Sequence, residues 1–182
     1  MRRFMWMVGL LVVAALPAHA QKTPQVEIMG GYSYMRSDLG GADLGMNGWQ
    51  ASVTENLNNW FGGTAEFSGF YATTTPPLGP PDINVNAHTF LFGPQFSHRK
   101  NPNFTPFVHV LLGGIHGSQG YLGISQPKTD FAAEFGGGVD IKIHKNLAIR
   151  VIQADYVVTP FFGQRQDNVR LSAGIVLRFG QK

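Results

Sequence analysis

The chain contains no cysteine, and charged residues make up only 14% of its 182 residues. Without cysteine it can form no disulfide bond and offers no thiol for lipid attachment. Hydrophobic residues make up 43% of the chain and glycine occurs 23 times. This composition is too apolar for a disordered chain, and the length predicts one domain.

Long hydrophobic runs are missing everywhere except at the N-terminus. The mean hydropathy is −0.05, which excludes a membrane protein made of many apolar helices. Such an average is typical of barrels whose strands alternate between apolar and polar residues.

The N-terminus has the three parts of a secretory signal peptide. Arg2 and Arg3 supply positive charge, residues 4–16 are apolar, and Ala18-His19-Ala20 forms an A-x-A cleavage site. An uncleaved anchor helix is the alternative, but the apolar segment is too short to span a membrane. We therefore predict a cleaved signal peptide at residues 1–20 and one domain at residues 21–182.

The calculated pI of 9.3 raises the question of nucleic-acid binding. Loss of Arg2 and Arg3 with the signal peptide leaves 12 basic against 11 acidic residues. The only basic cluster after that is His98-Arg99-Lys100. Near-neutral charge and export both argue against a nucleic-acid partner.

After residue 20 the sequence shows no sustained helical period. Runs of about 10 to 15 residues, rich in β-branched and aromatic residues, alternate with Pro, Asn, Asp and Gly, a pattern typical of strands. Such runs are long for a globular protein and suit tilted strands that cross a membrane. We predict eight strands, at residues 25–36, 45–57, 60–72, 84–98, 103–117, 129–143, 146–158 and 167–179.

The predicted connections alternate between long and short. The longer ones are residues 37–43, 73–83, 117–128 and 159–166, and the second of these holds four prolines. The short ones are residues 58–59, 99–102 and 144–145. Barrels of the outer membrane have short periplasmic turns and longer outer loops, so the pattern predicts that orientation.

The last predicted strand shows the clearest alternation. Val169, Leu171 and Ile175 share one face, whereas Arg170, Ser172 and Arg178 share the other. Periodicity alone leaves two barrels open: a soluble lipocalin-like carrier with an apolar interior, or a membrane barrel with the apolar face outward. Strand length and loop lengths favour the membrane barrel. So do aromatic residues near strand ends, which can form interfacial girdles: Trp49, Trp60, Tyr71, Phe104 and Phe179.

Two segments carry a family resemblance. Residues 172–179 end in alternating apolar residues and a terminal aromatic, similar to the assembly signal of outer-membrane barrels; Ser172, Gly174, Leu177 and Phe179 are its matching positions. Residues 135–156, with the triple glycine at residues 136–138 and Ala154-Asp155-Tyr156, resemble the OmpA/OmpX-type outer-membrane β-barrel family. The resemblance implies insertion by the outer-membrane barrel machinery and contact with outer-membrane lipid.

The polar strand faces predict a filled, charged interior. Interior charges must pair, because an unpaired buried charge costs several kcal/mol. Arg150 and Asp155 share a face only if a β-bulge lies near Val151 and Ile152. The predicted interior charges are Glu27, Glu66, Glu134, Asp140, Arg150, Asp155, Arg170 and Arg178.

One enzymatic alternative rests on His116-Gly117-Ser118. A serine activated by a histidine would suit a lipid A deacylase, but no acid lies beside this pair in the sequence. We expect no catalytic, metal or cofactor site. The predicted fold is all-β, a single eight-stranded antiparallel up-and-down transmembrane β-barrel in the bacterial outer membrane. Its expected role is non-enzymatic: structural, adhesive or envelope-stabilising, as a monomer, with loops available for extracellular contacts. A narrow, porin-like ion pathway and the soluble carrier remain alternatives.

Overall fold

The computed structural model describes residues 23–38, 43–74, 83–101, 103–121, 124–159 and 166–180. The predicted signal peptide and most of the proline-rich connection lie outside these residues. Within them, no helix is long and apolar enough to cross a membrane.

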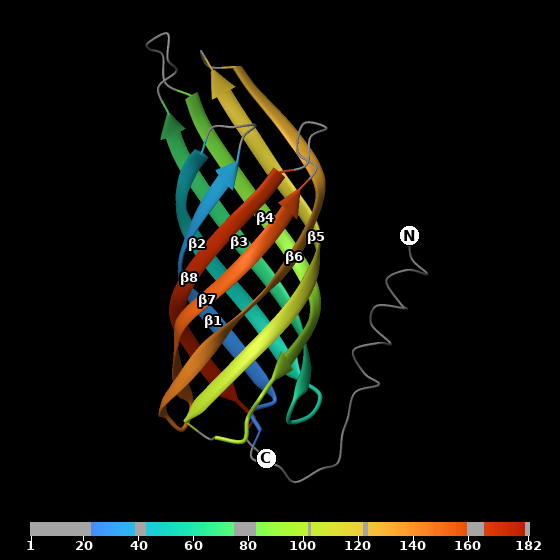
Figure 1. Cartoon of the computed structure of the whole chain (residues 1–182), viewed down its shortest axis with the longest axis vertical. Helices are drawn as coiled ribbons and strands as arrows, with labels where there is room; N and C mark the ends of the chain where they lie inside the picture. Colours follow the sequence, from blue (N-terminus) through green and yellow to red (C-terminus); the bar gives the residue numbers. More distant parts are fainter. Residues whose placement is uncertain are drawn as a thin grey trace, which may run out of the picture.

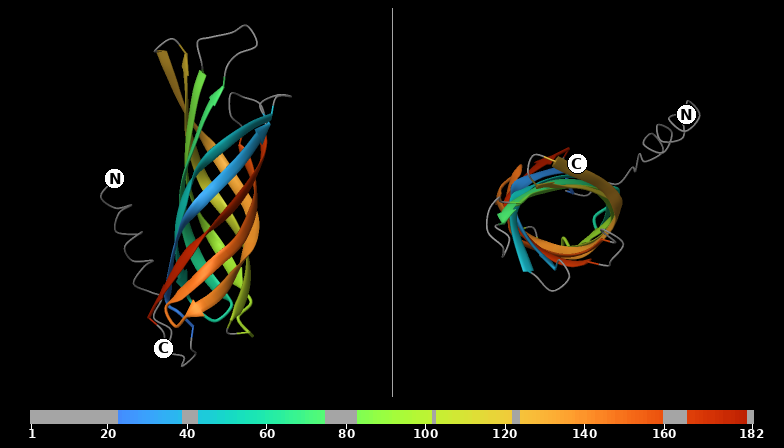
Figure 2. Two further views of the ribbon diagram at one scale, coloured as in Figure 1. Left: turned by 90° about the vertical axis from the view of Figure 1, so that its left-hand side faces the viewer. Right: turned by 90° about the horizontal axis from the view of Figure 1, so that it is seen from above.

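The described chain forms eight strands in one closed sheet (Figures 1 and 2). Each strand pairs antiparallel with its neighbours in sequence, and β8 pairs back with β1. This confirms the predicted fold class. The strands are β1 (Val26–Asp38), β2 (Asp43–Asn56), β3 (Phe61–Thr74), β4 (Ile83–Ser97), β5 (Phe104–Tyr121), β6 (Ile124–His144), β7 (Leu147–Thr159) and β8 (Gln166–Phe179).

The seam between β1 and β8 extends one residue before β1, where the Gln25 N–H donates to the Phe179 carbonyl at 2.9 Å. Gly31 and Gly174 face each other across this seam. A β-carbon on either glycine would collide with the backbone of the other strand. Glycine therefore allows the first and last strands to approach closely enough to close the barrel.

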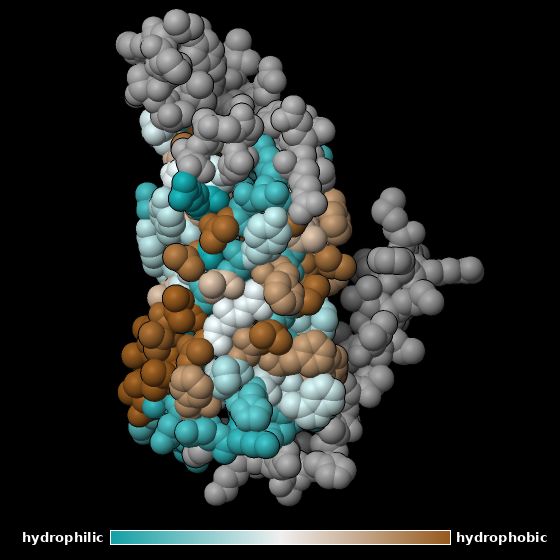
Figure 3. All heavy atoms as spheres, in the orientation of Figure 1, coloured by the Kyte–Doolittle hydropathy of each residue, from teal (hydrophilic) through white to brown (hydrophobic). Residues whose placement is uncertain are grey.

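Alternation along each strand sets the two faces of the wall. In β8, Arg170 and Arg178 are 1% and 4% exposed, whereas Ile175 is 56% exposed. The large exposed hydrophobic side chains lie on the outer wall of every strand, and Figure 3 shows hydrophobic residues across the middle of the visible face, with hydrophilic residues at its lower edge. An apolar exterior around a polar interior is the arrangement of a membrane barrel. It is opposite to that of a soluble lipocalin-like carrier.

Three short turns lie at one end of the barrel, which we call the turn end; the other is the loop end. The turns are residues 57–60, 98–103 and 145–146. In the first turn, the Asn58 side-chain oxygen accepts bonds from the N–H groups of Trp60 and Phe61 at 2.9 and 2.8 Å. Such a local side-chain bond fixes a tight turn.

One predicted loop is wrong. Residues 117–128 were expected to connect β5 and β6, but pairing continues from Gly117↔Lys128 to Tyr121↔Ile124. Pairing between β6 and β7 begins only at Ala133↔Val158, so the hairpin rises above β7 and β8 (Figure 2). The β7 side of the hairpin is therefore a sheet edge, where a proline such as Pro127 costs no ladder hydrogen bond.

The structure has a β-bulge in β7 at Val151 and Ile152, where the spacing of Arg150 and Asp155 predicted one. On β8, Arg150 pairs with Gly174 and Gln153 pairs with Ser172, so β7 has one extra residue between these pairs. Val151 and Ile152 are both about half exposed, and Arg150, Gln153 and Asp155 all point inward. The bulge lets both charged residues face the interior despite their odd spacing.

Candidate functional site in the barrel interior

All eight charged side chains expected inside the barrel lie there, each no more than 5% exposed. They come from five strands: Glu27 from β1, Glu66 from β3, Glu134 and Asp140 from β6, Arg150 and Asp155 from β7, and Arg170 and Arg178 from β8. The strand alternation points each of them inward. The structure adds two more, Arg99 and His109, and sorts the set into a central cluster and a second group nearer the turn end.

Arg170 is the centre of the first cluster. Its Nη2 lies 2.6 Å from Glu66 Oε1, 2.6 Å from Glu134 Oε1 and 2.7 Å from Asp155 Oδ2. Its Nε donates a second bond to Asp155 at 3.0 Å. One guanidinium therefore joins carboxylates from three other strands across the lumen, and the fixed fork of arginine suits such multiple bonding.

Two amides extend this cluster. Gln50 Nε2, on β2, donates to Glu66 Oε2 at 2.6 Å. Gln153 Nε2 donates to Asp155 Oδ2 at 2.8 Å, and Gln153 Oε1 accepts a bond from Arg150 Nη1 at 2.7 Å. Because Gln153 bonds both Asp155 and Arg150, it links the central cluster to the second group. Its side chain is 0% exposed, so this link lies inside the barrel.

His109, on β5, adds a sixth strand to this cluster, after β2, β3, β6, β7 and β8. Its Nε2 lies 2.9 Å from Asp155 Oδ1 and 3.2 Å from Glu134 Oε1. Since carboxylates only accept hydrogen bonds, Nε2 carries a proton and donates. The histidine therefore belongs to the charge network, although the sequence offered no reason to single it out from other strand histidines.

Glu27 is the shared acceptor in the second group of charges, nearer the turn end. Arg178 Nε donates to its Oε1 at 2.8 Å, and Arg99 Nη2 donates to its Oε2 at 2.5 Å. Asn56 Nδ2 adds a third donor at 2.9 Å. Arg99 comes from the turn after β4, where the sequence had shown only a small basic cluster. The alternation of Gln95 and Ser97 continues to Arg99 and would have predicted an inward side chain.

Asp140 and Arg150 form a two-pronged pair on neighbouring strands, with Nε to Oδ1 at 2.8 Å and Nη2 to Oδ2 at 3.2 Å. The guanidinium carbon of Arg150 also lies 4.1 Å from the centre of the Phe107 ring. Bidentate pairing and stacking on an aromatic ring are both specific to arginine, so lysine cannot replace it here.

The charges of the buried groups nearly balance. Among the described residues, five carboxylates face four guanidinium groups: Glu27, Glu66, Glu134, Asp140 and Asp155 against Arg99, Arg150, Arg170 and Arg178. The carboxylates therefore outnumber the guanidinium groups by one, and His109 contacts two of them, Glu134 and Asp155. One further proton, on His109 or on one of these two carboxylates, makes the interior neutral.

Within the part of the chain that the structure describes, His109, Glu134 and Asp155 could hold a metal ion, with ligand atoms within 4.8 Å of one another. Arg170 already bonds both carboxylates, so its guanidinium occupies the position of a cation between them. The arrangement is that of an ion-pair network and not of a metal centre with open coordination positions.

The other singled-out residues lie outside this network. His116 is exposed, and its Nδ1 lies 2.8 Å from the hydroxyl of Thr129 on β6, so its described hydrogen bond is not to Ser118. In the proposed assembly segment, Ser172 is buried and bonds Ser33 at 2.7 Å. Leu177 and Phe179 are 43% and 45% exposed on the outer wall, and Gly174 lies at the β1 seam.

The family follows from the sequence itself. Residues 7–179 match the model of the outer membrane protein beta-barrel domain. The chain belongs to this family. It is an integral β-barrel protein of the bacterial outer membrane. Barrels of this kind have short periplasmic turns, so we expect the turn end to be the periplasmic end. No curated protein sequence matches the chain.

Solved structures show the same fold. The Yersinia pestis attachment invasion locus protein Ail, crystallised with the heparin analogue sucrose octasulfate, is 21% identical with a TM-score of 0.60, over 85% of this chain and 99% of Ail. Neisserial surface protein A is 11% identical with a TM-score of 0.70, over 85% and 97% of the two chains. Pseudomonas aeruginosa OprG is 13% identical with a TM-score of 0.53, over 88% and 98%.

Proposed function

We propose that this protein is a non-enzymatic structural barrel of the outer membrane, sealed by its interior charges, which stabilises the envelope and presents its outer loops for adhesive contacts. The observation that carries the proposal is the Arg170 cluster, which joins carboxylates from β3, β6 and β7 to β8. The interior of an eight-stranded barrel is narrow enough for side chains to fill, and this cluster crosses it at the level of Arg170.

The network also supports a mechanical role. Ion pairs and amide bonds cross the lumen between strands that are not neighbours in the sheet, as from Glu66 on β3 to Arg170 on β8. Removing one partner of such a buried ion pair leaves the other charge buried without compensation. The interior therefore resists opening of the wall in a way that the backbone ladder alone does not.

Conductance in planar lipid bilayers tests the seal. We expect the purified wild-type barrel to give no regular conductance steps. A variant with Gln50→Ala, Glu66→Ala and Arg170→Ala removes three filling side chains together with one charge of each sign, and we expect discrete steps from it. Leu171→Ala, on the lipid-facing side next to Arg170, is the matched control and should stay silent. Regular steps from the wild type would instead support the narrow ion pathway.

The assembly route is part of the proposal. We propose that the barrel inserts as a monomer through the outer-membrane insertion machinery, which reads the outward face of β8. Leu177 and Phe179 lie exposed on the wall at the periplasmic end, where a partner can contact them before the β1 seam closes.

A further inference from the structure

The outer wall changes from apolar to polar over three rows of paired residues near the loop end. The row nearer the turn end consists of Phe67, Phe90, Gly114 and Phe131. The row nearer the loop end consists of Asn47, Tyr71, Asn86 and Ser118. The apolar band of a membrane barrel ends where the lipid head groups begin, so these rows lie at the membrane interface.

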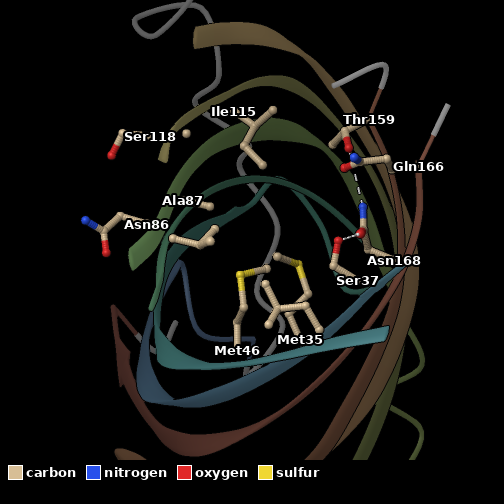
Figure 4. A pocket seen from close by; sticks show the side chains of 13 residues that line it. Met35, Ser37, Met46, Asn86, Ala87, Ile115, Ser118, Thr159, Gln166 and Asn168 are labelled. Carbon is tan, nitrogen blue, oxygen red and sulfur yellow. Dashed lines mark hydrogen bonds between the residues drawn. The ribbon is translucent and has the colours of Figure 1, made fainter. Parts of the chain in front are cut away.

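The row between these two carries a pair of histidines. Its members, each the strand partner of the next, are Trp49, Gly69, His88, His116 and Thr129. Figure 4 shows the side chains of Ala87 and Ile115 lining the interior, and both are buried. Because side chains alternate along a strand, the next residues, His88 and His116, face outward, and both are exposed.

The two imidazole rings lean apart, although strand partners have β-carbons only about 5 Å from each other. A β-carbon on Gly69 would lie 3.0 Å from His88 Nδ1, so the His88 ring lies toward β3, where the Tyr71 ring packs against it at a centroid distance of 5.6 Å. His116 Nδ1 lies 2.8 Å from the Thr129 hydroxyl on β6. The histidines are therefore held toward opposite sides and leave a space between them.

A groove of about 440 Å³ lies in the outer wall at this place. Its apolar part is lined by Trp49, Phe67 and Phe90. Gly114 leaves a gap beside Phe90 in the apolar row. Among the described residues, a β-carbon on Gly114 would contact only the Asp130 carbonyl oxygen, at 3.5 Å, so the gap is open. The groove therefore joins an apolar cleft to the two imidazoles, and its volume is within the range of about 300–1,000 Å³ found for ligand sites.

The membrane supplies the occupant. The outer wall of an integral barrel is covered by lipid, so hydrocarbon chains reach the apolar part of the groove. At the polar edge, no described lining residue is acidic, and an imidazole donates a hydrogen bond whether it is neutral or charged. Phosphate oxygens accept such bonds strongly because they are ionised. Charge and polarity therefore select a lipid with a phosphate in its head group.

We propose that this groove binds a phosphorylated lipid of the membrane leaflet at the loop end, with an acyl chain over Gly114 and the phosphate between His88 and His116. The contact with Thr129 holds His116 through Nδ1 and leaves its Nε2 for the phosphate. The site goes beyond the structural role proposed above and does not depend on it, because a sealed interior requires no particular lipid on the outer wall.

The tryptophans provide the test. The predicted mature chain has two: Trp49 lines the groove, whereas Trp60 stacks on Phe96 at the turn end. Trp60→Phe and Trp49→Phe proteins in maltoside micelles therefore report on one place each. Phosphatidic acid with brominated acyl chains should quench Trp49 fluorescence saturably. Brominated diacylglycerol, which has the same chains without the phosphate, should need a concentration about tenfold higher, as expected for the loss of a hydrogen bond to a charged group. Trp60 should not distinguish the two lipids.

Substitutions in the Trp60→Phe protein separate the two parts of the site. His88→Ala with His116→Ala should remove the preference for phosphatidic acid, whereas His98→Ala with His144→Ala, two exposed histidines near the turn end, should keep it.

Gly114→Leu fills the apolar cleft and should weaken the quenching of Trp49 by both lipids. Gly63→Leu is the matched control: Gly63 also faces outward, and among the described residues a β-carbon there would contact nothing within 4 Å. It should leave the quenching intact.

Equal quenching of Trp49 by the two lipids, or a preference that survives the loss of both histidines, would overturn the proposal. Absence of saturable quenching together with a dimeric barrel would place a second copy of the chain in the groove instead. The comparison of the two lipids on the Trp60→Phe protein decides the question even if the groove variants do not assemble.

Discussion

At the residue scale, the interior charges depend on partners that are distant in the chain. Glu27 binds Arg99, 72 residues away, and Arg178, 151 residues away. Alternation predicts that such a side chain points inward, but not which charge it meets. The same limit explains His109: its position on β5 faces it inward, yet only the closed barrel brings Glu134 and Asp155 to its Nε2.

Arg170 gives the prediction at this scale. Arg170→Met leaves Glu66, Glu134 and Asp155 without their shared cation, and we expect the free energy of unfolding to fall by about 3–5 kcal/mol. Urea titration in lipid vesicles, followed by the gel mobility of the folded form, measures it. Adding Glu66→Gln, Glu134→Gln and Asp155→Asn should recover much of the loss, and Leu171→Met should cost little. An unchanged midpoint for Arg170→Met would show that the cluster contributes nothing to stability.

At the element scale, two features depart from regular strands joined by short loops: the bulge in β7 and the long hairpin of β5 and β6. The bulge in β7 was predictable, because Arg150 and Asp155 cannot both face inward on a regular strand. The extension of β5 and β6 was not. Residues 117–128 hold Gly, Ser, Gln and Pro, which suggest a loop, but continuous pairing from Gly117↔Lys128 onward forms a ladder despite weak local propensity.

The bulge provides the second prediction. Deleting Ile152 removes the extra residue, so Arg150 and Asp155 stand four residues apart and both face inward on a regular strand. We expect this variant to keep the folded, heat-modifiable form in the membrane fraction. Deleting Val151 and Ile152 together leaves an odd spacing of three residues, which places either Arg150 or Asp155 on the lipid-facing side. A charge there costs about 2–4 kcal/mol and its partner stays unpaired, so we expect the folded form of the double-deletion variant to be lost. Equal assembly of the two variants would contradict this account of the bulge.

At the scale of the whole molecule, closure unites the two ends of the chain. Phe179 at the end of β8 pairs with Val26 at the start of β1, so the last residues must be in place before the barrel is complete. Until then β8 presents an unpaired edge and an apolar outer face.

Phe179 and Phe104 make a matched pair for the third prediction. Both lie near the turn end, and they are 45% and 46% exposed on the outer wall. If the insertion machinery reads β8, Phe179→Ala should slow insertion severalfold, whereas Phe104→Ala should not. Pulse-chase labelling, with heat-modifiable mobility as the readout, compares the two rates. Equal rates would indicate that Phe179 acts only as one more lipid-facing aromatic.

The sequence by itself determined the class of the protein. A period of two, long strands and sparse charge specify which residues share a face, because these properties are local to each strand. Tertiary structure decided which charges pair, that Arg99 and His109 join them, and that a buried apolar cluster with Met35 borders Arg170 toward the loop end. These features arise only when the strands close into a ring, because closure sets the register across every seam and brings residues from opposite walls into contact. The alternation of β8 predicted that Arg170 faces inward, and the barrel gave it three carboxylates to bind.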